Sequence, residues 1–479
     1  MSTVDVEAEV DKTIDAAVER LREALVEVGR EANRGDVGFW QVEKRFAKAV
    51  IAFACRLLPV LLELYDHGAK YVEYEGEIWR RGTEKKTATY RSIWGEIEVE
   101  RWVYLKRGES GGRQLVPLEH QAGLIEGQWT PHCGEAISRL TQSVPSREAV
   151  EHMEVVGLAP YSRSSFDRVT ETVGETWEDH RLELEDEVIE AVEIPDEAVG
   201  ISVAYDRVRI EMDETQRDAE QWPNGRKQPR EIEGRMAYCA TVTLHDADGE
   251  PLWTKRYGRV SDQPPDQDVP GVGEWLIREQ VRYDVEALLD RAPRLEANRV
   301  VLTDGGPELE RIVDEDFPDW PKLCDMRHLD TYLADALEAT NLSSEQREHR
   351  RRRWKRQLKA DDEAIESIED ELEWWAGQEA VNDTLTYIDN RRKRMRYATA
   401  HAQNLPVASG HVEATCKSLV QVRMRRSGQR WTKETAQSIL NLRALALSDI
   451  WSTGTGALME RFTDDNVTRC DELCERYAA

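Results

Sequence analysis

The sequence contains little lysine. Only 15 of its 65 basic residues are Lys, whereas 93 residues are Asp or Glu, so the formal net charge is −28. An acidic, lysine-poor surface suits a protein kept soluble in high salt, where screening removes much of the repulsion between like charges. We therefore expect a halophilic (acidic) proteome as the source. Against this background, clusters of basic residues are a signal rather than a chance arrangement.

Cysteine is also scarce and shows no pattern. The seven Cys residues are odd in number, scattered along the chain, and form no Cys-x-x-Cys motif. These features argue against a disulfide framework and against a zinc finger. Cys470 and Cys474 lie about one helical turn apart, and a metal site formed there with His132 and Cys133 is a minor alternative.

Long apolar runs are missing as well. The most apolar stretch, "AVIAFACRLLPVLLELY", is interrupted by Arg56 and Pro59 and is too short to span a bilayer. The first residues, "MSTVDVEAEVDKTIDAAVERL", are charged and amphipathic, unlike a signal peptide. We expect a soluble protein of the cytoplasm, associated with the nucleoid and not with a membrane.

Two structural segments open the chain. Residues 5–33 carry apolar side chains at helical spacing and a second helix is expected from about 42 to 64, so residues 1–70 predict a helical hairpin for packing or dimerisation. Residues 71–130 change to short alternating segments such as "GEIEVERWVYL" and predict a small β-rich domain.

Residues 131–190 are helical again and have the outline of a helix-turn-helix. A first helix and a short turn lead to a second helix that Ser162 or Ser164 can cap. This second helix presents two basic residues, Arg163 and Arg168, to which we assign a DNA contact. Plain packing of two helices is the alternative.

The remaining residues, 191–479, predict an α/β domain with a mixed sheet, flanking helices and a helical insertion at about 330–400. Two apolar strands end at or near a carboxylate, Asp206 in "VGISVAYDRVRIEM" and Asp304 in "NRVVLTDGGPEL". Strand ends are where such a sheet exposes side chains to a ligand. Because an Asp at a strand end is also common in plain turns, a third ligand is needed to support a site.

Glu413 supplies that third carboxylate. It lies near the start of a helix, after the loop "LPVASG", whose Ser409 can act as the N-cap. Three carboxylates in one place repel one another and need divalent cations, and oxygen ligands of this kind select Mg²⁺ or Mn²⁺. Two such ions, about 3.5–4 Å apart, can activate a water or a 3′-hydroxyl for phosphodiester transfer. We therefore predict that Asp206, Asp304 and Glu413 are catalytic and bind two ions.

Three basic clusters occupy the C-terminal half: "REHRRRRWKRQLK" (347–359), "RRKRMR" (391–396) and the helix after Glu413. A solvated helix face is the alternative for each, but three together favour phosphate binding. Trp354 either stacks on a base or packs inward, and Cys416 is expected to pack. The candidate DNA-binding residues here are Lys417, Arg423, Arg425, Arg426, Arg430, Arg391, Arg392 and Lys393.

Several segments together resemble one family. They are "YIDNRRKRMRY", "LPVASGHVEATCKSLVQVRMRRSGQRW" and "LNLRAL" near the C-terminus, and "GISVAYDRVRI", "VLTDGGP" and "CDMRHL" upstream. The chain resembles the DDE transposases of prokaryotic insertion sequences, specifically the ISKra-type group. The resemblance covers most of residues 85–455.

By this resemblance the catalytic domain has a ribonuclease-H-like fold with a helical insertion between the second Asp and the Glu. Asp206, Asp304 and Glu413 correspond to the metal-binding triad of the family. Asp213 is the alternative first ligand, because Arg207 follows Asp206 where the family usually has Gly.

The sequence also departs from the family pattern elsewhere. Asn404 and Ala408 stand where glycines are usual, Gln429 replaces Met, and Arg327 replaces an aromatic residue before His328. None of these departures removes a carboxylate. His328 either orients a metal ligand, contacts a phosphate or is a structural residue.

The function implied is that of a transposase, which cleaves DNA at the ends of an insertion sequence and joins it to a target. The expected partners are the transposon ends and target DNA, with a homodimer or higher assembly on the DNA. Two alternatives remain. One is a catalytically silent, domesticated DNA-binding protein, and the other is a nuclease acting on RNA–DNA hybrids or Holliday junctions.

Overall fold

The computed structural model describes residues 3–35, 37–66, 68–106, 112–158, 161–214, 231–263, 271–407, 414–426 and 428–470. The chain forms two compact units, one of residues 1–184 with 452–479 and one of residues 185–451. The expected domain 191–479 therefore differs from the second unit, because residues 452–479 belong to the first unit. Among the described residues, no helix is long and apolar enough to cross a membrane.

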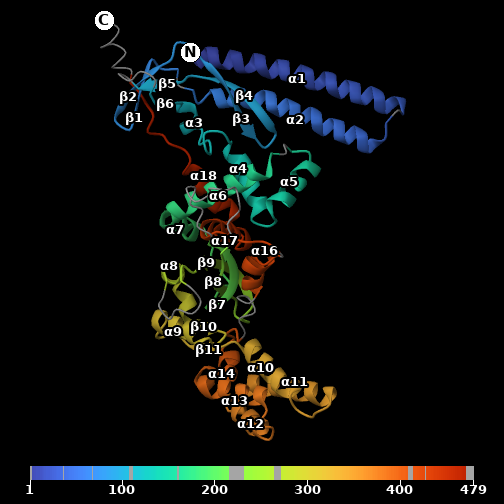
Figure 1. Cartoon of the computed structure of the whole chain (residues 1–479), viewed down its shortest axis with the longest axis vertical. Helices are drawn as coiled ribbons and strands as arrows, with labels where there is room; N and C mark the ends of the chain where they lie inside the picture. Colours follow the sequence, from blue (N-terminus) through green and yellow to red (C-terminus); the bar gives the residue numbers. More distant parts are fainter. Residues whose placement is uncertain are drawn as a thin grey trace, which may run out of the picture. The chain divides into compact units, whose positions relative to one another are not determined.

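The first unit opens with the predicted helical hairpin. Helices α1 (Thr3–Arg34) and α2 (Phe39–Glu63) lie side by side (Figure 1). Gly35 follows α1 with a φ of 75°, a left-handed conformation that suits glycine. Arg45 of α2 forms an ion pair with Glu31 of α1 and so joins the two helices.

The predicted β-rich region follows. One sheet has the order β12-β1-β2-β5-β6, and β3 pairs with β4 as a separate hairpin. The strands are β1 (Tyr71–Tyr74), β2 (Glu77–Arg81), β3 (Lys86–Ser92), β4 (Gly95–Arg101), β5 (Tyr104–Lys106), β6 (Gln114–Leu115) and β12 (Thr468–Arg469). Val72, Trp79 and Tyr104 form part of the buried core of this sheet.

Helices complete the first unit. They are α3 (Pro117–Gln121), α4 (Pro131–Thr141), α5 (Ser146–Val155), α6 (Arg163–Asp179), the first turn of α7 (Arg181–Ala191), whose remainder belongs to the second unit, and nearly all of α18 (Trp451–Glu460). The predicted helix pair is α5 and α6, and Ser162 caps α6 by accepting a hydrogen bond from the Ser165 N–H. Thr141 and Thr170 share a buried hydrogen bond of 2.7 Å that links α4 to α6.

The second unit is built on a mixed sheet of order β11-β10-β7-β8-β9. Strand β7 is central, runs antiparallel to β8, and is parallel to β10, which is parallel to β11. The strands are β7 (Gly200–Asp213), β8 (Ile232–His245), β9 (Pro251–Val260), β10 (Asn298–Thr303) and β11 (Lys322–Cys324). Strands β8 and β9 are antiparallel and form a hairpin.

The expectation that the first strand ends near Asp206 is wrong. Strand β7 continues to Asp213, so Asp206 lies in its middle. Beyond Asp206 the buried residues Val208, Ile210 and Met212 alternate with more exposed ones, which is the pattern of a strand with one covered face. The charged residues between them do not end the strand because they point away from the core.

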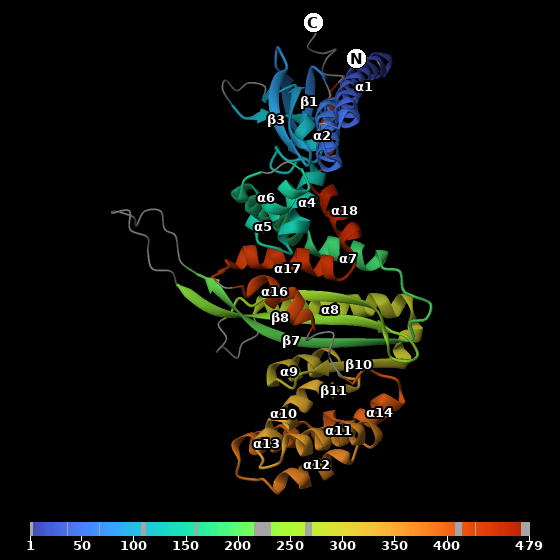
Figure 2. The same cartoon turned by 90° about the vertical axis from the view of Figure 1, so that its right-hand side faces the viewer.

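Helices cover both faces of this sheet. Val208 and Ile210 pack against helices η4 and α17, and Figure 2 shows α16 and α17 along this face. On the opposite face Tyr257 of β9 donates a 2.6 Å hydrogen bond to Asp284 of α8. The helices of the two faces are α8 (Val272–Arg291), η2 (Pro293–Ala297), α9 (Pro307–Asp316), the π-helix η4 (Cys416–Gln421), α16 (Val422–Met424) and α17 (Lys433–Leu447).

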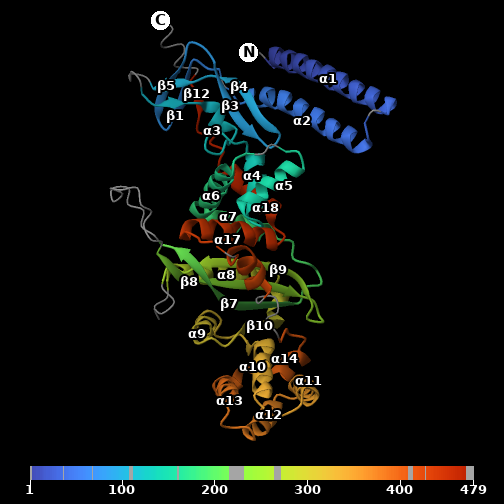
Figure 3. The ribbon, with the colours of Figure 1, turned by 45° about the vertical axis from the view of Figure 1, so that its right-hand side comes forward.

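The predicted helical insertion follows β11. It contains α10 (Met326–Glu338), α11 (Ser344–Ala360), α12 (Ala364–Glu373), α13 (Glu379–Arg391), η3 (Arg392–Arg394) and α14 (Tyr397–Ala402), gathered together in Figure 3. These helices share a core that includes Trp354, Tyr387 and Tyr397. Trp354 is fully buried, so of its two predicted roles the structure favours packing.

Candidate active site

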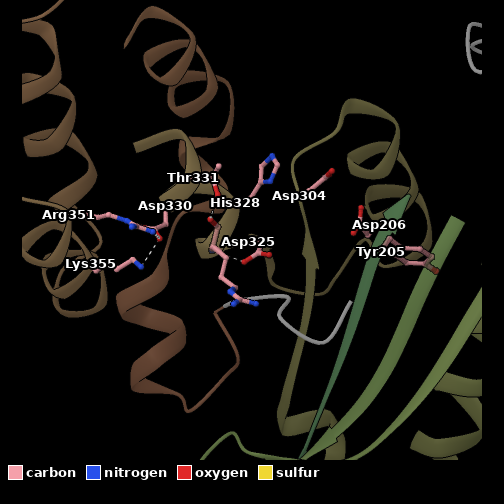
Figure 4. Close-up of a pocket in the computed structure, with 10 residues that line it drawn as sticks. Tyr205, Asp206, Asp304, Asp325, His328, Asp330, Thr331, Arg351 and Lys355 are labelled. Carbon is pink, nitrogen blue, oxygen red and sulfur yellow. Dashed lines mark hydrogen bonds and ion pairs between the residues drawn. The ribbon is translucent and has the colours of Figure 1, made fainter. Parts of the chain in front are cut away.

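The fold brings Asp206 and Asp304 together. Tyr205 of β7 is in register with Thr303, the last residue of β10, so the two Asp residues come next on neighbouring parallel strands. Both line one cleft of about 530 Å³, together with His328. Figure 4 shows Asp206 on its strand, Asp304 in the loop after the next strand, and His328 beside Asp304. Two of the three predicted metal ligands therefore face the same space.

Asp206 lies in an environment that disfavours its charge. Burial raises the pKa of Asp206, and the negative charge of Asp304 raises it further. The Arg207 N–H at 2.6 Å and the thiol of Cys416 donate hydrogen bonds to the carboxylate and oppose the rise. Both effects that raise the pKa would be relieved by a cation bound between the two carboxylates.

The loop that carries Asp304 is fixed from several sides. The Asp304 side chain accepts a 2.7 Å hydrogen bond from the Gly306 N–H, and its backbone carbonyl accepts one of 3.1 Å from the Tyr387 hydroxyl. Gly305 has a φ of +85°, and a Cβ there would lie 2.5 Å from the Arg391 side chain. Glycine is therefore required at this turn, which is the "DGG" of the sequence.

The predicted third ligand, Glu413, and its capping residue Ser409 lie outside the described residues. Among the residues that the structure does describe, no group of three His, Cys, Asp or Glu side chains is arranged to hold a metal ion. The helical segment that follows reaches the cleft, because the buried Cys416 of η4 donates its hydrogen bond to Asp206. Glu413 therefore stays a prediction, close in sequence to a residue that touches the site.

Asp213, the alternative first ligand, is the last residue of β7 and is not among the residues that line this cleft. Its backbone N–H donates to the carbonyl of Trp431 at 2.8 Å. The position of Asp206 beside Asp304 favours Asp206 over Asp213 as the first carboxylate.

Three cations line the cleft opposite the carboxylates; two belong to the predicted basic cluster 347–359, and the third, Arg327, was noted only as a departure from the family pattern. Arg327 is at the start of α10, and Arg351 and Lys355 are one turn apart on α11. Both α11 residues form ion pairs with Asp330, Arg351 through two hydrogen bonds and Lys355 at 2.6 Å (Figure 4). Since Asp330 neutralises one charge of two, this group keeps a net positive charge facing the cleft.

The predicted DNA-binding residues after Glu413 differ in accessibility. Lys417, Arg425 and Arg430 are exposed and Arg426 is partly exposed. Arg423 is only 5% exposed, and its guanidinium lies 4.7 Å from the ring centroid of Trp431. The structure thus gives Arg423 a packing role, whereas the other four remain candidates for phosphate contacts.

The second predicted cluster is partly engaged within the protein. Arg391 donates a 2.7 Å hydrogen bond to the Gly305 carbonyl and so supports the Asp304 loop. Arg392 forms a 2.7 Å ion pair with Glu369, and Lys393 is exposed. Of these residues Lys393 is the most accessible to DNA.

In the first unit, Arg163 and Arg168 lie on α6 as predicted. Arg168 pairs with Glu126 at 2.7 Å, and Arg163 donates to the Ser146 hydroxyl at 3.1 Å. Both side chains are more than half exposed, so neither pairing prevents a contact with DNA.

Comparison with known proteins gives little. No family model matches the chain, and no curated protein matches it. Among solved structures, the crystal structure of a pre-cleavage Mos1 transpososome is similar at 10% identity, over 58% of this chain and 79% of that one. The TM-score is 0.15, which is too low to carry an argument about fold or function.

Proposed function

We propose that this chain is a DDE transposase of the ISKra type, which cleaves DNA at the ends of an insertion sequence and transfers the strand to a target. One observation carries the proposal. Two carboxylates, Asp206 and Asp304, line a cleft whose other wall carries Arg327, Arg351 and Lys355. Carboxylates for metal ions opposite cations for phosphates are the parts that phosphodiester chemistry needs.

The fold agrees with this proposal. The second unit has a mixed sheet flanked by helices, with a helical insertion after the second Asp. These are the features expected of a ribonuclease-H-like catalytic domain. We assign the catalytic chemistry to the second unit for this reason.

The residues at the site fit a divalent metal. Asp206 and Asp304 offer hard oxygen ligands, and burial together with mutual repulsion raises the pKa of Asp206. With Glu413 they would hold two Mg²⁺ or Mn²⁺ ions, which supply an activated hydroxyl and stabilise the leaving oxygen. Cys416 and the Arg207 N–H orient the Asp206 carboxylate for this purpose.

The remaining residues of the cleft position the DNA. Arg351 and Lys355 are held by Asp330 and offer N–H donors to phosphate oxygens. Lys417 and Arg425, exposed beyond Cys416, extend the basic surface. We assign recognition of the transposon ends to α5 and α6 with Arg163 and Arg168, and we propose a homodimer or higher assembly on the DNA, in a halophilic cell.

A nicking assay tests the proposal. The substrate is a supercoiled plasmid that carries the DNA flanking the gene, incubated with Mg²⁺ or with EDTA. We expect Mg²⁺-dependent nicking that Asp206→Asn, Asp304→Asn and Glu413→Gln each abolish, whereas Asp213→Asn retains it. Full activity of Asp304→Asn would show that the proposed metal site is wrong. DNA binding by a wild-type protein that does not nick would identify the silent, domesticated alternative.

A further inference from the structure

A second cleft adjoins the candidate active site. It has a volume of about 440 Å³ and lies between α10, α13 and the loop after β10. Asp304 and His328 line both clefts. A ligand group bound at the two carboxylates therefore has this second space directly beside it.

The wall of the second cleft is aromatic. Tyr332 is stacked on Tyr387, with ring centroids 4.2 Å apart and an angle of 15° between the rings. The His328 and Tyr332 rings form a T-shaped pair, with centroids 5.4 Å apart. Tyr387 is buried and anchors the Asp304 loop, while Tyr332 and His328 are partly exposed. Such a wall suits a flat, unsaturated ring that stacks.

Polar side chains from the same face of α13 as Tyr387 also line the cleft. Asp383, Thr386 and Asn390 line the cleft at helical spacing and are exposed. They offer hydrogen-bond acceptors together with the amide donor of Asn390. A ring that stacks on Tyr332 thus has partners for its edge.

The second cleft is poorly suited to a phosphate because the cation that lines it is already engaged. The Arg391 guanidinium contacts the Gly305 carbonyl and Glu310 at 3.3 Å, and the cleft also carries the carboxylates Asp304 and Asp383. The first cleft, in contrast, has three cations beside its four carboxylates. Helix α10 separates the two environments, since Arg327 and Thr331 face the first and Tyr332 faces the second.

We propose that the second cleft binds an unpaired DNA base, next to the phosphate held at Asp206 and Asp304. The base stacks on Tyr332, and Asn390 and Asp383 contact its edge. The Asp383 carboxylate accepts from an exocyclic amino group, which cytosine and adenine have and thymine lacks. The site therefore prefers an amino-bearing base over thymine. This inference rests on the proposed function, because it requires DNA in the first cleft.

The test uses single-stranded probes with a chain of abasic units and one central base, dC, dA, dT or none. Binding to the full-length protein is measured by fluorescence anisotropy in Ca²⁺. We expect a central dC or dA to tighten binding by about 5- to 150-fold over the baseless probe, the range found for stacking of one base. A central dT should tighten it less.

Variants of the second cleft assign the effect. Tyr332→Ala should remove the gain from the base and Tyr332→Phe should keep it, because only the ring stacks. Asp383→Ala, at an exposed position of α13, should make dC and dT bind alike without affecting the fold. Arg351→Ala should weaken all probes equally, including the baseless one. Equal binding of the dC and baseless probes, or an unchanged gain in Tyr332→Ala, would overturn the inference.

The outcomes separate this inference from the proposed function. Nicking that depends on Asp304, with no gain from a central base, rejects the base site alone. A gain from the base that Tyr332→Ala removes, in a protein that does not nick DNA, supports the base site and rejects the proposed catalysis.

Discussion

The two cations that Asp330 holds give the sharpest prediction about DNA binding. If Arg351 and Lys355 each contact one phosphate, each contributes about 0.9 to the slope of log K against log salt concentration for duplex DNA. The double variant Arg351→Ala/Lys355→Ala should therefore lower that slope by about 1.8. Over a four-fold increase in salt, the wild type should lose about 12-fold more affinity than the double variant loses.

The assay is fluorescence anisotropy with a labelled duplex, titrated at several salt concentrations in Ca²⁺. Arg352→Ala/Lys359→Ala is the matched control, because it removes the same two charges from the same helix at exposed positions that do not line the cleft. An equal change of slope in both double variants would refute the assignment. So would an unchanged slope in Arg351→Ala/Lys355→Ala.

Folding has to be monitored in this experiment. Asp330 is only 7% exposed, so loss of both partners leaves a nearly buried carboxylate unpaired. Adding Asp330→Asn to the double variant should recover thermal stability without recovering the slope. That result would separate the stability effect from the phosphate contacts.

Three further predictions concern the second unit. Burial alone would raise the pKa of Asp330, but the hydrogen bonds from Arg351 and Lys355 outweigh it and lower that pKa. Asp330→Asn should therefore reduce the free energy of unfolding in urea by about 1–2 kcal/mol at pH 7. This loss should shrink as the pH falls below about 4, where the carboxylate becomes protonated. Gly305→Ala should lower the melting temperature more than Gly428→Ala, since both have a positive φ but only the former places a Cβ against Arg391; equal losses would show that contact to be unimportant. Lys255→Met leaves the carboxylates of Asp284 and Glu185, which lie 2.6 and 2.8 Å from the Lys255 ammonium, without their cation. It should reduce the free energy of unfolding in urea by about 3–5 kcal/mol. A loss below about 1 kcal/mol would indicate that the two carboxyl groups are neutral in this variant.

The elements of the fold were largely predictable because their patterns are local. The hairpin of the first unit, the β8–β9 turn and the helix starting near Arg163 follow from spacing, glycines and capping residues. Strand β7 was predicted too short, because a charged residue in a half-exposed strand looks like a strand end in one dimension. The choice of Asp206 was nevertheless consistent with the structure, since register with β10 places it beside Asp304.

The details of the site were less predictable because they depend on how helices are rotated. Residues 347–359 were recognised as basic, but which cations face the cleft depends on the buried Trp354 and Leu358, which fix the orientation of α11. Burial of Arg423 against Trp431 is likewise a tertiary contact that spacing does not reveal. The Cys416 thiol was expected only to pack, and its hydrogen bond to Asp206 depends on the approach of η4 to β7.

The place of Asp206 in the middle of β7 has a consequence for how such a protein can change over time. Side chains alternate between the two faces of a strand, so deletion of one residue between Gly200 and Asp206 would turn the carboxylate toward α8 or force the whole strand out of register. A point substitution in this segment changes one side chain, whereas a change of length moves every following side chain to the other face of the strand. Insertions should therefore be tolerated in turns such as 246–249 and eliminated ahead of Asp206, which a library of single-residue insertions and deletions selected for the proposed nicking activity would reveal.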